Sequence, residues 1–263
     1  MTGAILGQFF RSWVGLDPRR IERLSLGNSV SKKKATIELI SACTRLKRLE
    51  IKGYMGQDKD QLAVGDVKRI VMAWKQARGG TDPVLEELAL PAMWASKGTV
   101  SMLALDHLPH LKTPSLRAET DTVPDANVRL PASIRKLHVH WHTYGHSGNT
   151  IEAAITTRRL LAACPYLTEL HVTIDRPSIA LDDALATAPR SLETLTLEGN
   201  RLTETSLRPL LGRRALRTLT LRSCHCEASE TLEALQQVEG LSVTISWPYV
   251  PVAPRPDFQD GNY

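Results

Sequence analysis

Four of the eight histidines in this 263-residue chain lie within nine positions, at His138, His140, His142 and His146. Imidazole is a frequent ligand of zinc, which takes three or four nitrogen, sulfur or oxygen ligands at about 2.0–2.2 Å. It is also the side chain whose charge changes near neutral pH, which suits acid–base catalysis. The stretch is therefore a metal site, a catalytic cluster or the polar face of a strand. The elements that carry these histidines decide among the three.

A short apolar pattern recurs along the chain and includes His138 in one copy and His171 in another. The pattern is Leu-x-x-Leu-x-Leu, with Ile or Val allowed at the Leu positions, and a ninth, weaker copy begins at Val238. Segments with helical periodicity lie between several copies, at 35–45, 66–77, 150–165, 205–215 and 228–237. Alternation of strand and helix at a regular period predicts an α/β solenoid. The eight clear copies begin at Ile21, Leu46, Leu85, Val100, Ile134, Leu167, Leu192 and Leu216.

The copies "LETLTLEGN" and "LRTLTLRSC" carry Asn200 and Cys224 at their ninth position, and "IERLSLGN" carries Asn28 at its eighth. Together with the apolar pattern, this resembles the leucine-rich repeat family, in the longer variety found in ribonuclease inhibitor and in F-box proteins. The spacings from Leu167 onward are 25, 24 and 22 residues, within the roughly 20–29 typical of such repeats. The resemblance implies a right-handed solenoid with a parallel concave sheet and convex helices, in which the Asn or Cys hydrogen-bonds the turn backbone between repeats.

The middle of the chain departs from this regular spacing. The copies at Leu46 and Leu85 lie 39 residues apart, and those at Val100 and Ile134 lie 34 apart. We therefore expect irregular middle repeats, and we expect residues 108–131 to hold a degenerate repeat with an exposed loop. The predicted organisation is an N-terminal cap at 1–20, a repeat domain at 21–245 and a Pro-rich tail at 246–263.

The repeat assigns each histidine to a face of the sheet. Because successive side chains of a strand face opposite ways, Leu137 and Val139 point into the core, whereas His138 and His140 point outward. The next copy places His171 beside His138, and neighbouring strands lie about 4.8 Å apart. By the same alignment, His140 neighbours Thr173 and Glu198, and a continued strand would place His142 beside Asp175 and Asn200.

A metal site is the less favoured interpretation of this cluster. Same-face residues of one strand are roughly 6.6 Å apart, so His138 and His140 would have to lean together to share an ion. We predict a recognition surface that needs neither a metal nor a cofactor and holds no catalytic residue. The predicted partner-binding residues are Lys136, His138, His140, Glu169, His171, Thr173, Thr196, Glu198 and Arg222.

Other motifs favour structural roles. Cys43 and Cys164 precede two copies in matching settings, which predicts buried positions. Cys226 is the spare thiol of "SCHC", because the repeat already accounts for Cys224. The stretch "GHSG" at 145–148 lacks the Gly-x-Ser-x-Gly elbow and indicates a loop. The glycine patterns of phosphate- and dinucleotide-binding loops are missing from the sequence.

The composition permits several partners without selecting one. Thirty-three Lys and Arg against 28 Asp and Glu give a net charge of +5, and the basic blocks at 31–34, 45–48 and 212–214 are short. A nucleic-acid partner is therefore permitted, but no recognition motif supports it. No apolar run approaches the roughly 18 residues of a membrane span. Four cysteines and the lack of an Asn-x-Ser/Thr site fit the cytoplasm or nucleus.

These observations favour a noncatalytic module that binds a partner protein on its concave sheet. The most specific version is a substrate-recognition or adaptor subunit of a ubiquitin ligase, although an F-box is longer than the twenty residues before Ile21. The alternatives are a structural subunit of a ribonucleoprotein or another large assembly, and a metal-dependent hydrolase centred on His138, His140 and His171. The partner and the oligomeric state do not follow from the sequence.

Overall fold

The sheet is the central element of the fold. The computed structural model describes residues 17–27, 33–52, 54–55, 64–93, 105–119, 129–142, 150–174 and 181–246. In this part of the chain nine strands form an open parallel sheet in the order β1-β2-β4-β5-β6-β7-β8-β10-β12, and β3 adds to β4. The strands are β1 (Arg23–Leu26), β2 (Arg48–Ile51), β3 (Tyr54–Met55), β4 (Glu87–Met93), β5 (Thr113–Glu119), β6 (Lys136–His142), β7 (Glu169–Ile174), β8 (Thr194–Glu198), β10 (Thr218–Arg222) and β12 (Ser242–Ser246).

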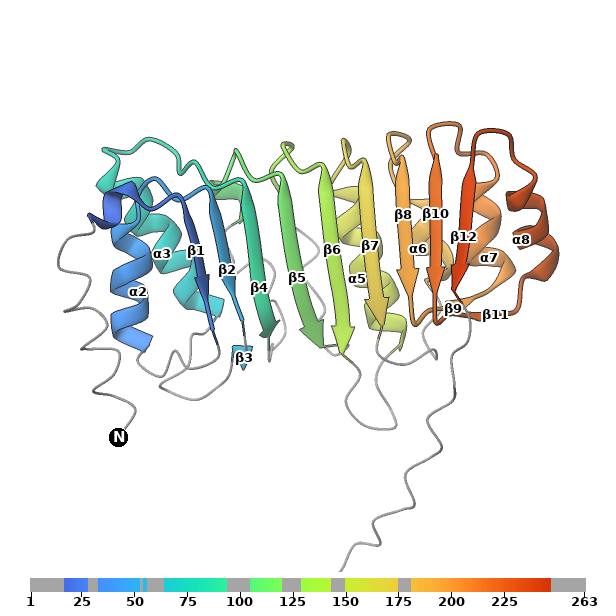
Figure 1. The fold of residues 1–263 in the computed structure, drawn as a ribbon, viewed down its shortest axis with the longest axis horizontal. Helices are drawn as coiled ribbons and strands as arrows, with labels where there is room; N and C mark the ends of the chain where they lie inside the picture. Colours follow the sequence, from blue (N-terminus) through green and yellow to red (C-terminus); the bar gives the residue numbers. More distant parts are fainter. Residues whose placement is uncertain are drawn as a thin grey trace, which may run out of the picture.

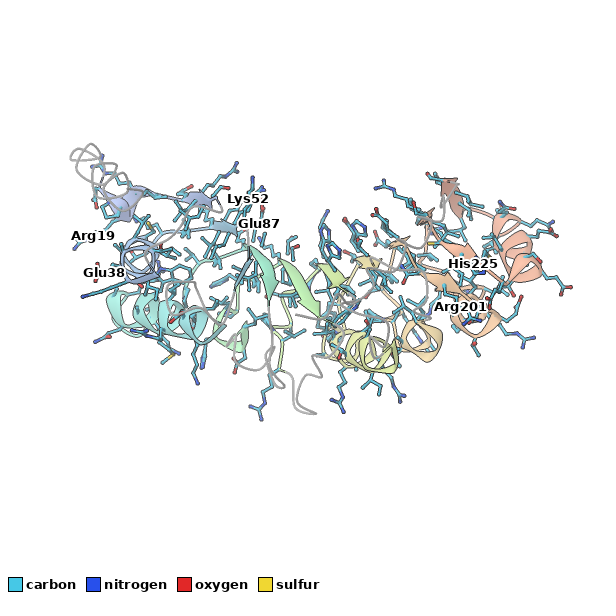
Figure 2. All side chains as sticks on the ribbon, turned by 90° about the horizontal axis from the view of Figure 1, so that it is seen from below. Arg19, Glu38, Lys52, Glu87, Arg201 and His225 are labelled. Atoms are coloured by element: carbon cyan, nitrogen blue, oxygen red, sulfur yellow. The ribbon has the colours of Figure 1, made fainter. Side chains whose placement is uncertain are left out.

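The helices lie along one face of the sheet (Figure 1). Viewed from below, the sheet curves with the helices on its outer side, and Lys52 and Glu87 project from the other side (Figure 2). We call that other side the open face. The helical elements are η1 (Pro18–Arg20), α2 (Lys33–Ala42), α3 (Val64–Ala77), η2 (Leu105–His107), α5 (Thr150–Ala162), α6 (Asp182–Ala186), α7 (Glu204–Leu207), η3 (Arg208–Leu210) and α8 (Ser229–Gln236). Among the described residues, no helix is long and apolar enough to cross a bilayer.

The apolar positions of the repeated pattern form the core between sheet and helices. Leu137, Leu170, Leu195 and Leu219 occupy equivalent positions in the register of β6, β7, β8 and β10. All four are fully buried. In β7 and β8, buried and half-buried residues alternate along the whole strand. The predicted inside and outside assignment is thus confirmed for these strands, and so is the α/β arrangement with a parallel sheet.

Polar side chains tie the turns after the strands to neighbouring repeats. The buried Asn200 amide donates to the carbonyls of Val172 and Glu198, at 3.2 and 2.9 Å. At the equivalent position, the Cys224 thiol donates to the carbonyls of Leu197 and Arg222, both at 3.3 Å. Gly199 precedes Asn200 with φ +69°, and a Cβ there would lie 1.8 Å from the Ile174 carbonyl oxygen. A side chain at position 199 is therefore excluded by the close approach of the preceding repeat.

The strand beside β4 is not the copy from Val100. Of that copy only Leu105 is described, and it begins the short helix η2, whereas residues 100–104 lie outside the described residues. The strand β5 lies instead at Thr113–Glu119, inside the segment where a degenerate repeat was expected, and Pro114 replaces the usual Leu there. The ladder between β4 and β5 also shifts at Pro91, between Ala89 and Ala92. Proline lacks the backbone N–H of a ladder, which explains why the middle repeats are irregular.

The ninth copy was wrong by two residues. Leu219 pairs with Val243 rather than with Leu241, so this repeat begins at Gly240 and the last spacing is 24 residues. A shift of two keeps the faces of a strand unchanged, and Ser242 and Thr244 are exposed as expected. The five predicted helical segments all contain helix, whereas α6 was not predicted. Most of the proposed cap and all but Ser246 of the proposed tail lie outside the described residues.

The buried Leu195 and its half-buried neighbour Thr196 provide a stability test. We expect Leu195→Ala to lower the free energy of unfolding by about 2–5 kcal/mol, because it leaves a cavity between β8 and the helices. Thr196→Ala should cost less than about 1 kcal/mol, because its side chain faces the open side. Urea denaturation followed by circular dichroism measures both values, and similar losses at the two sites would contradict the assignment of faces.

Candidate functional site

Strands β6 and β7 place most of the predicted binding residues side by side at the centre of the open face. His138 pairs in register with His171, Lys136 with Glu169, and His140 with Thr173. The next strand places Glu198 beside Thr173. This register follows from the alignment of the buried leucines, because one face of a strand cannot shift without the other. The structure thus brings His138, His140 and His171 onto neighbouring strands, as the sequence predicts.

His138 and His171 contact each other, and each lies near a carboxylate. The rings of His138 and His171 meet edge to face, with their centroids 5.3 Å apart and their planes at 71°. His171 Nε2 lies 3.4 Å from Glu198 Oε2 and 3.3 Å from the Thr173 hydroxyl. We call His138, His171, Glu169, Glu198 and Lys136 the histidine–carboxylate cluster.

Glu169 connects the cluster to a fixed positive charge. Its carboxylate lies 2.6 Å from Lys136 Nζ and 3.9 Å from His138 Nε2. The side chains of His138, Glu169 and Lys136 are 41%, 32% and 51% exposed, so a partner can reach all three. Because each charge is half solvated, these ion pairs orient side chains more than they stabilise the fold.

The pKa of His138 is lowered from its ordinary value. Partial burial is the largest cause, and repulsion from His171 is the second. Attraction to Glu169 opposes both, whereas Lys136 adds to the lowering. His138 is therefore biased toward the neutral ring, which both donates and accepts hydrogen bonds.

The remaining predicted residues extend the surface toward the C-terminal repeats. Thr196 and Thr220 continue the row that begins with His138 and His171, and Arg222 lies next to Glu198 in the register of β8 and β10. Thr196 is half-buried and Arg222 is exposed. Strand β6 runs to His142, as expected, but Asp175 lies outside the described residues. Asn200 was wrongly assigned to the exposed row, since its side chain is buried in the turn.

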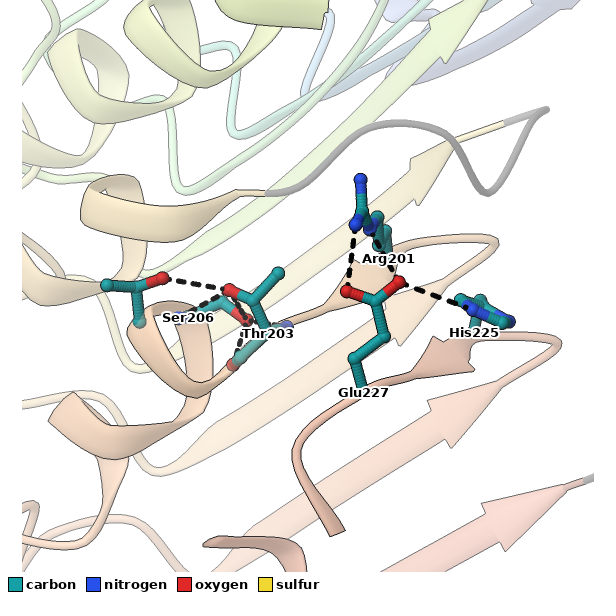
Figure 3. A network of polar contacts seen from close by, with 6 residues as sticks. Arg201, Thr203, Ser206, His225 and Glu227 are labelled. Atoms are coloured by element: carbon teal, nitrogen blue, oxygen red, sulfur yellow. Dashed lines mark hydrogen bonds and ion pairs between the residues drawn. The ribbon is translucent and has the colours of Figure 1, made fainter.

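The described residues do not assemble a metal site. Among them, no group of three or more His, Cys, Asp or Glu is arranged to hold an ion. His225 of "SCHC" lies 3.5 Å from Glu227, which forms a two-pronged ion pair with Arg201 at 2.9 Å (Figure 3). Arg201 and His225 belong to the small second sheet, formed by β9 (Arg201–Leu202) and β11 (His225–Cys226). Their shared contact with Glu227 links the two strands. The hydrogen bond from Arg201 lowers the pKa of Glu227, which favours the paired carboxylate.

Three of the cysteines are poor nucleophiles. Burial raises the pKa of Cys43 to about 11, of Cys164 to about 12 and of Cys224 to about 11. The thiolate is the reactive form, so thiols with such pKa values are inert at neutral pH. Cys43 and Cys164 are buried, as their repeat positions predicted. Their part in the molecule is to pack the helix ends against the sheet.

A row of ion pairs at the start of the strands was not predicted from the sequence. Lys47 lies 3.1 Å from Glu22, Lys112 lies 2.9 Å from Glu86, and a third pair joins Arg48 and Glu87 at 3.1 Å. Opposite charges at equivalent positions of neighbouring copies are the signal that was available. These pairs fix the charged side chains of the N-terminal repeats next to one another.

Comparison with known proteins adds no relative. No protein-family model matches the chain, and no curated protein matches it.

The histidine–carboxylate cluster predicts opposite pKa changes on its two sides. His171→Gln removes a repelling charge and should raise the pKa of His138, whereas Glu169→Gln removes an attracting one and should lower it. Nuclear magnetic resonance of the imidazoles between pH 5 and 8 measures both shifts. The matched control is His225→Gln in β11, outside the cluster, which should leave the pKa of His138 unchanged. A shift in the same direction in both cluster variants would contradict the proposed geometry.

The same pKa shift makes stability depend on pH. The folded pKa of His138 lies below its unfolded value of about 6.5, so proton uptake favours the unfolded chain. The contribution of neutral His138 to stability should be complete above about pH 6.5 and should be lost as the pH falls through the lower folded pKa. Thermal unfolding of wild type and His138→Gln across this range measures the effect, and parallel pH profiles for the two proteins would contradict it.

Proposed function

We propose that this protein is a noncatalytic leucine-rich repeat module that binds a partner protein on its open face. The observation that carries the proposal is the histidine–carboxylate cluster, held half-exposed at the centre of a sheet face that bears no described helix. A surface built on a packed core loses little conformational freedom on binding, which favours affinity.

The size of the open face fits a protein partner. Nine strands at about 4.8 Å and five residues at about 3.3 Å give a flat area of roughly 700 Å². Side chains add to this area, and a standard protein interface covers about 800 Å² on each partner. The outward side chains change along the sheet, from charged residues on β1 and β2, through histidines on β6 and β7, to hydroxyls on β8, β10 and β12. An extended partner can therefore make different contacts with different strands.

The repeat type is supported by the turns as well as by the leucines. Asn200 and Cys224 bond the backbone after β8 and β10, which is the role that the leucine-rich repeat resemblance implies. The more specific proposal is a substrate-recognition or adaptor subunit of a ubiquitin ligase, acting in the cytoplasm or nucleus. In that role the open face holds the substrate and no described residue needs to take part in chemistry.

A triple variant tests the open face directly. Affinity purification with the wild-type chain identifies partners, and calorimetry then measures the affinity of a purified one. Changing His138, His140 and His171 to Ala should weaken binding at least tenfold, because a few central residues carry most of the energy of an interface. The wild-type affinity should also change as the pH falls below about 6.5, because His138 then takes up a proton.

The matched control changes three exposed residues of the helix layer, Lys68, Met72 and Gln76, to Ala. This variant should bind like the wild type, and both variants should keep most of their thermal stability. Equal affinity of the histidine variant and the wild type would refute the role of the open face. Stoichiometric zinc in the wild type that is lost in the histidine variant would instead support a metal site.

A further inference from the structure

The edge of the sheet at which the strands begin is rich in arginine. The loops that enter β6, β7, β8 and β10 cover residues 129–135, 163–168, 187–193 and 211–217, and form part of the upper edge in Figure 1. Glu193 is the one acidic residue in these four segments. Six arginines lie in the same segments, and we call them the arginine edge: Arg129, Arg135, Arg190, Arg213, Arg214 and Arg217.

Backbone hydrogen bonds hold these loops side by side. Thr168 N donates to Arg135 O, Glu193 N donates to Thr168 O, and Arg217 N donates to Glu193 O, each at 2.8 Å. Arg135 and Arg217 are therefore three strand spacings apart, or about 14 Å. The four loops therefore form one strip, in which Thr168 and Glu193 lie in register between Arg135 and Arg217.

Arg213 fixes two of the loops to each other. Its guanidinium donates to the carbonyls of Ala186, at 2.8 Å, and of Ala188, which lie four and two residues before Arg190. The pKa of Arg213 is lowered, first by burial and then by the charge of Arg190. The two cations are thus close enough to repel, and the strip gains from a bound anion.

The other arginines of the strip are exposed and available. Arg190, Arg214 and Arg217 are exposed, and no described carboxylate forms an ion pair with any of them. Elsewhere, Lys47, Lys112 and Arg201 each pair with a glutamate. With six arginines and one acidic residue, these four loops carry a local excess of positive charge.

An exposed aromatic ring lies within the strip. Tyr166 is 56% exposed, and the Arg135 guanidinium carbon lies 5.3 Å from the centre of its ring. Arg135 also donates to the carbonyls of Ala132 and Ile134, at 2.8 and 3.1 Å, so its position is fixed. A phenol ring next to a fixed cation offers one face for stacking beside charges that bind phosphate.

We propose that the arginine edge and Tyr166 bind single-stranded nucleic acid, at a site separate from the open face. Arginine binds phosphate with a planar, two-pronged fork, and the bases of a single strand stack on exposed aromatic rings. An acidic protein segment would match the charge but would gain little from Tyr166. The strip length of about 14 Å corresponds to about four nucleotides at roughly 3.4 Å each.

Fluorescence anisotropy with labelled 20-nucleotide RNA and DNA of one sequence tests the proposal. The edge variant combines Arg190→Gln, Arg214→Gln and Arg217→Gln, which leaves the backbone contacts of Arg135 and Arg213 intact. We expect at least tenfold weaker binding and a log–log salt slope smaller by about 2, since each phosphate contact on a single strand contributes about 0.7. Tyr166→Ala should weaken nucleic-acid binding about tenfold but leave the binding of inorganic polyphosphate unchanged, because polyphosphate has no bases.

The matched control combines Lys68→Gln, Arg158→Gln and Arg208→Gln, three exposed cations of the helical elements, and so keeps the same net charge as the edge variant. It should bind like the wild type. Equal loss in both triple variants would show that only net charge matters and would overturn the site. The proposal also fails if polyglutamate competes as well as RNA while Tyr166→Ala has no effect, a result that identifies an acidic protein segment. A preference between RNA and DNA identifies the source of the strand, and either supports the site.

Discussion

The burial of two apolar side chains in each strand, against the helices, is the constraint on which the molecule depends. Leu195 and Leu197 in β8, and Leu219 and Leu221 in β10, have no exposed surface. Because side chains alternate along a strand, burying this pair fixes the direction of every neighbour. Parallel pairing then places equivalent residues of successive repeats next to one another. The packing of this core therefore sets the positions of the residues on the open face and on the arginine edge.

The two surfaces use that order differently. On the open face, positive and negative side chains alternate between strands, and the pairs of Arg48 with Glu87 and of Lys136 with Glu169 leave little net charge. On the arginine edge, three of the four loops contribute arginines, and Glu193 is the one carboxylate among them. Exposed ion pairs contribute only about 0–1 kcal/mol each, so neither surface is needed for folding. This independence allows both faces to be altered without loss of the fold.

The sequence predicts the faces of the strands better than their positions. The burial of Leu137 and Leu170 and the register of the histidines were predicted from the alternation of side chains. The two-residue error at β12 did not change the predicted faces, because a shift of two keeps each side chain on the same face. The strand beside β4 was predicted at Val100 but lies at Thr113–Glu119, where Pro114 interrupts the apolar pattern. The contact between the two rings, and the nearness of Arg190 to Arg213, depend on side-chain positions in three dimensions. The arginine edge was missed because it lies in loops, where no periodicity marks neighbouring residues.

Cross-linking between β6 and β7 tests the register most directly. Neighbouring strands about 4.8 Å apart lie within the roughly 4.4–6.8 Å between Cα atoms that a disulfide spans. The variant His138→Cys/His171→Cys should form a disulfide under mild oxidation, detected by mass spectrometry, and should still unfold cooperatively. The pair His138→Cys/Val172→Cys should not form one, because Val172 is buried on the other face. Equal cross-linking in both pairs, or none in the first, would contradict the register and with it the placement of the histidines on the open face.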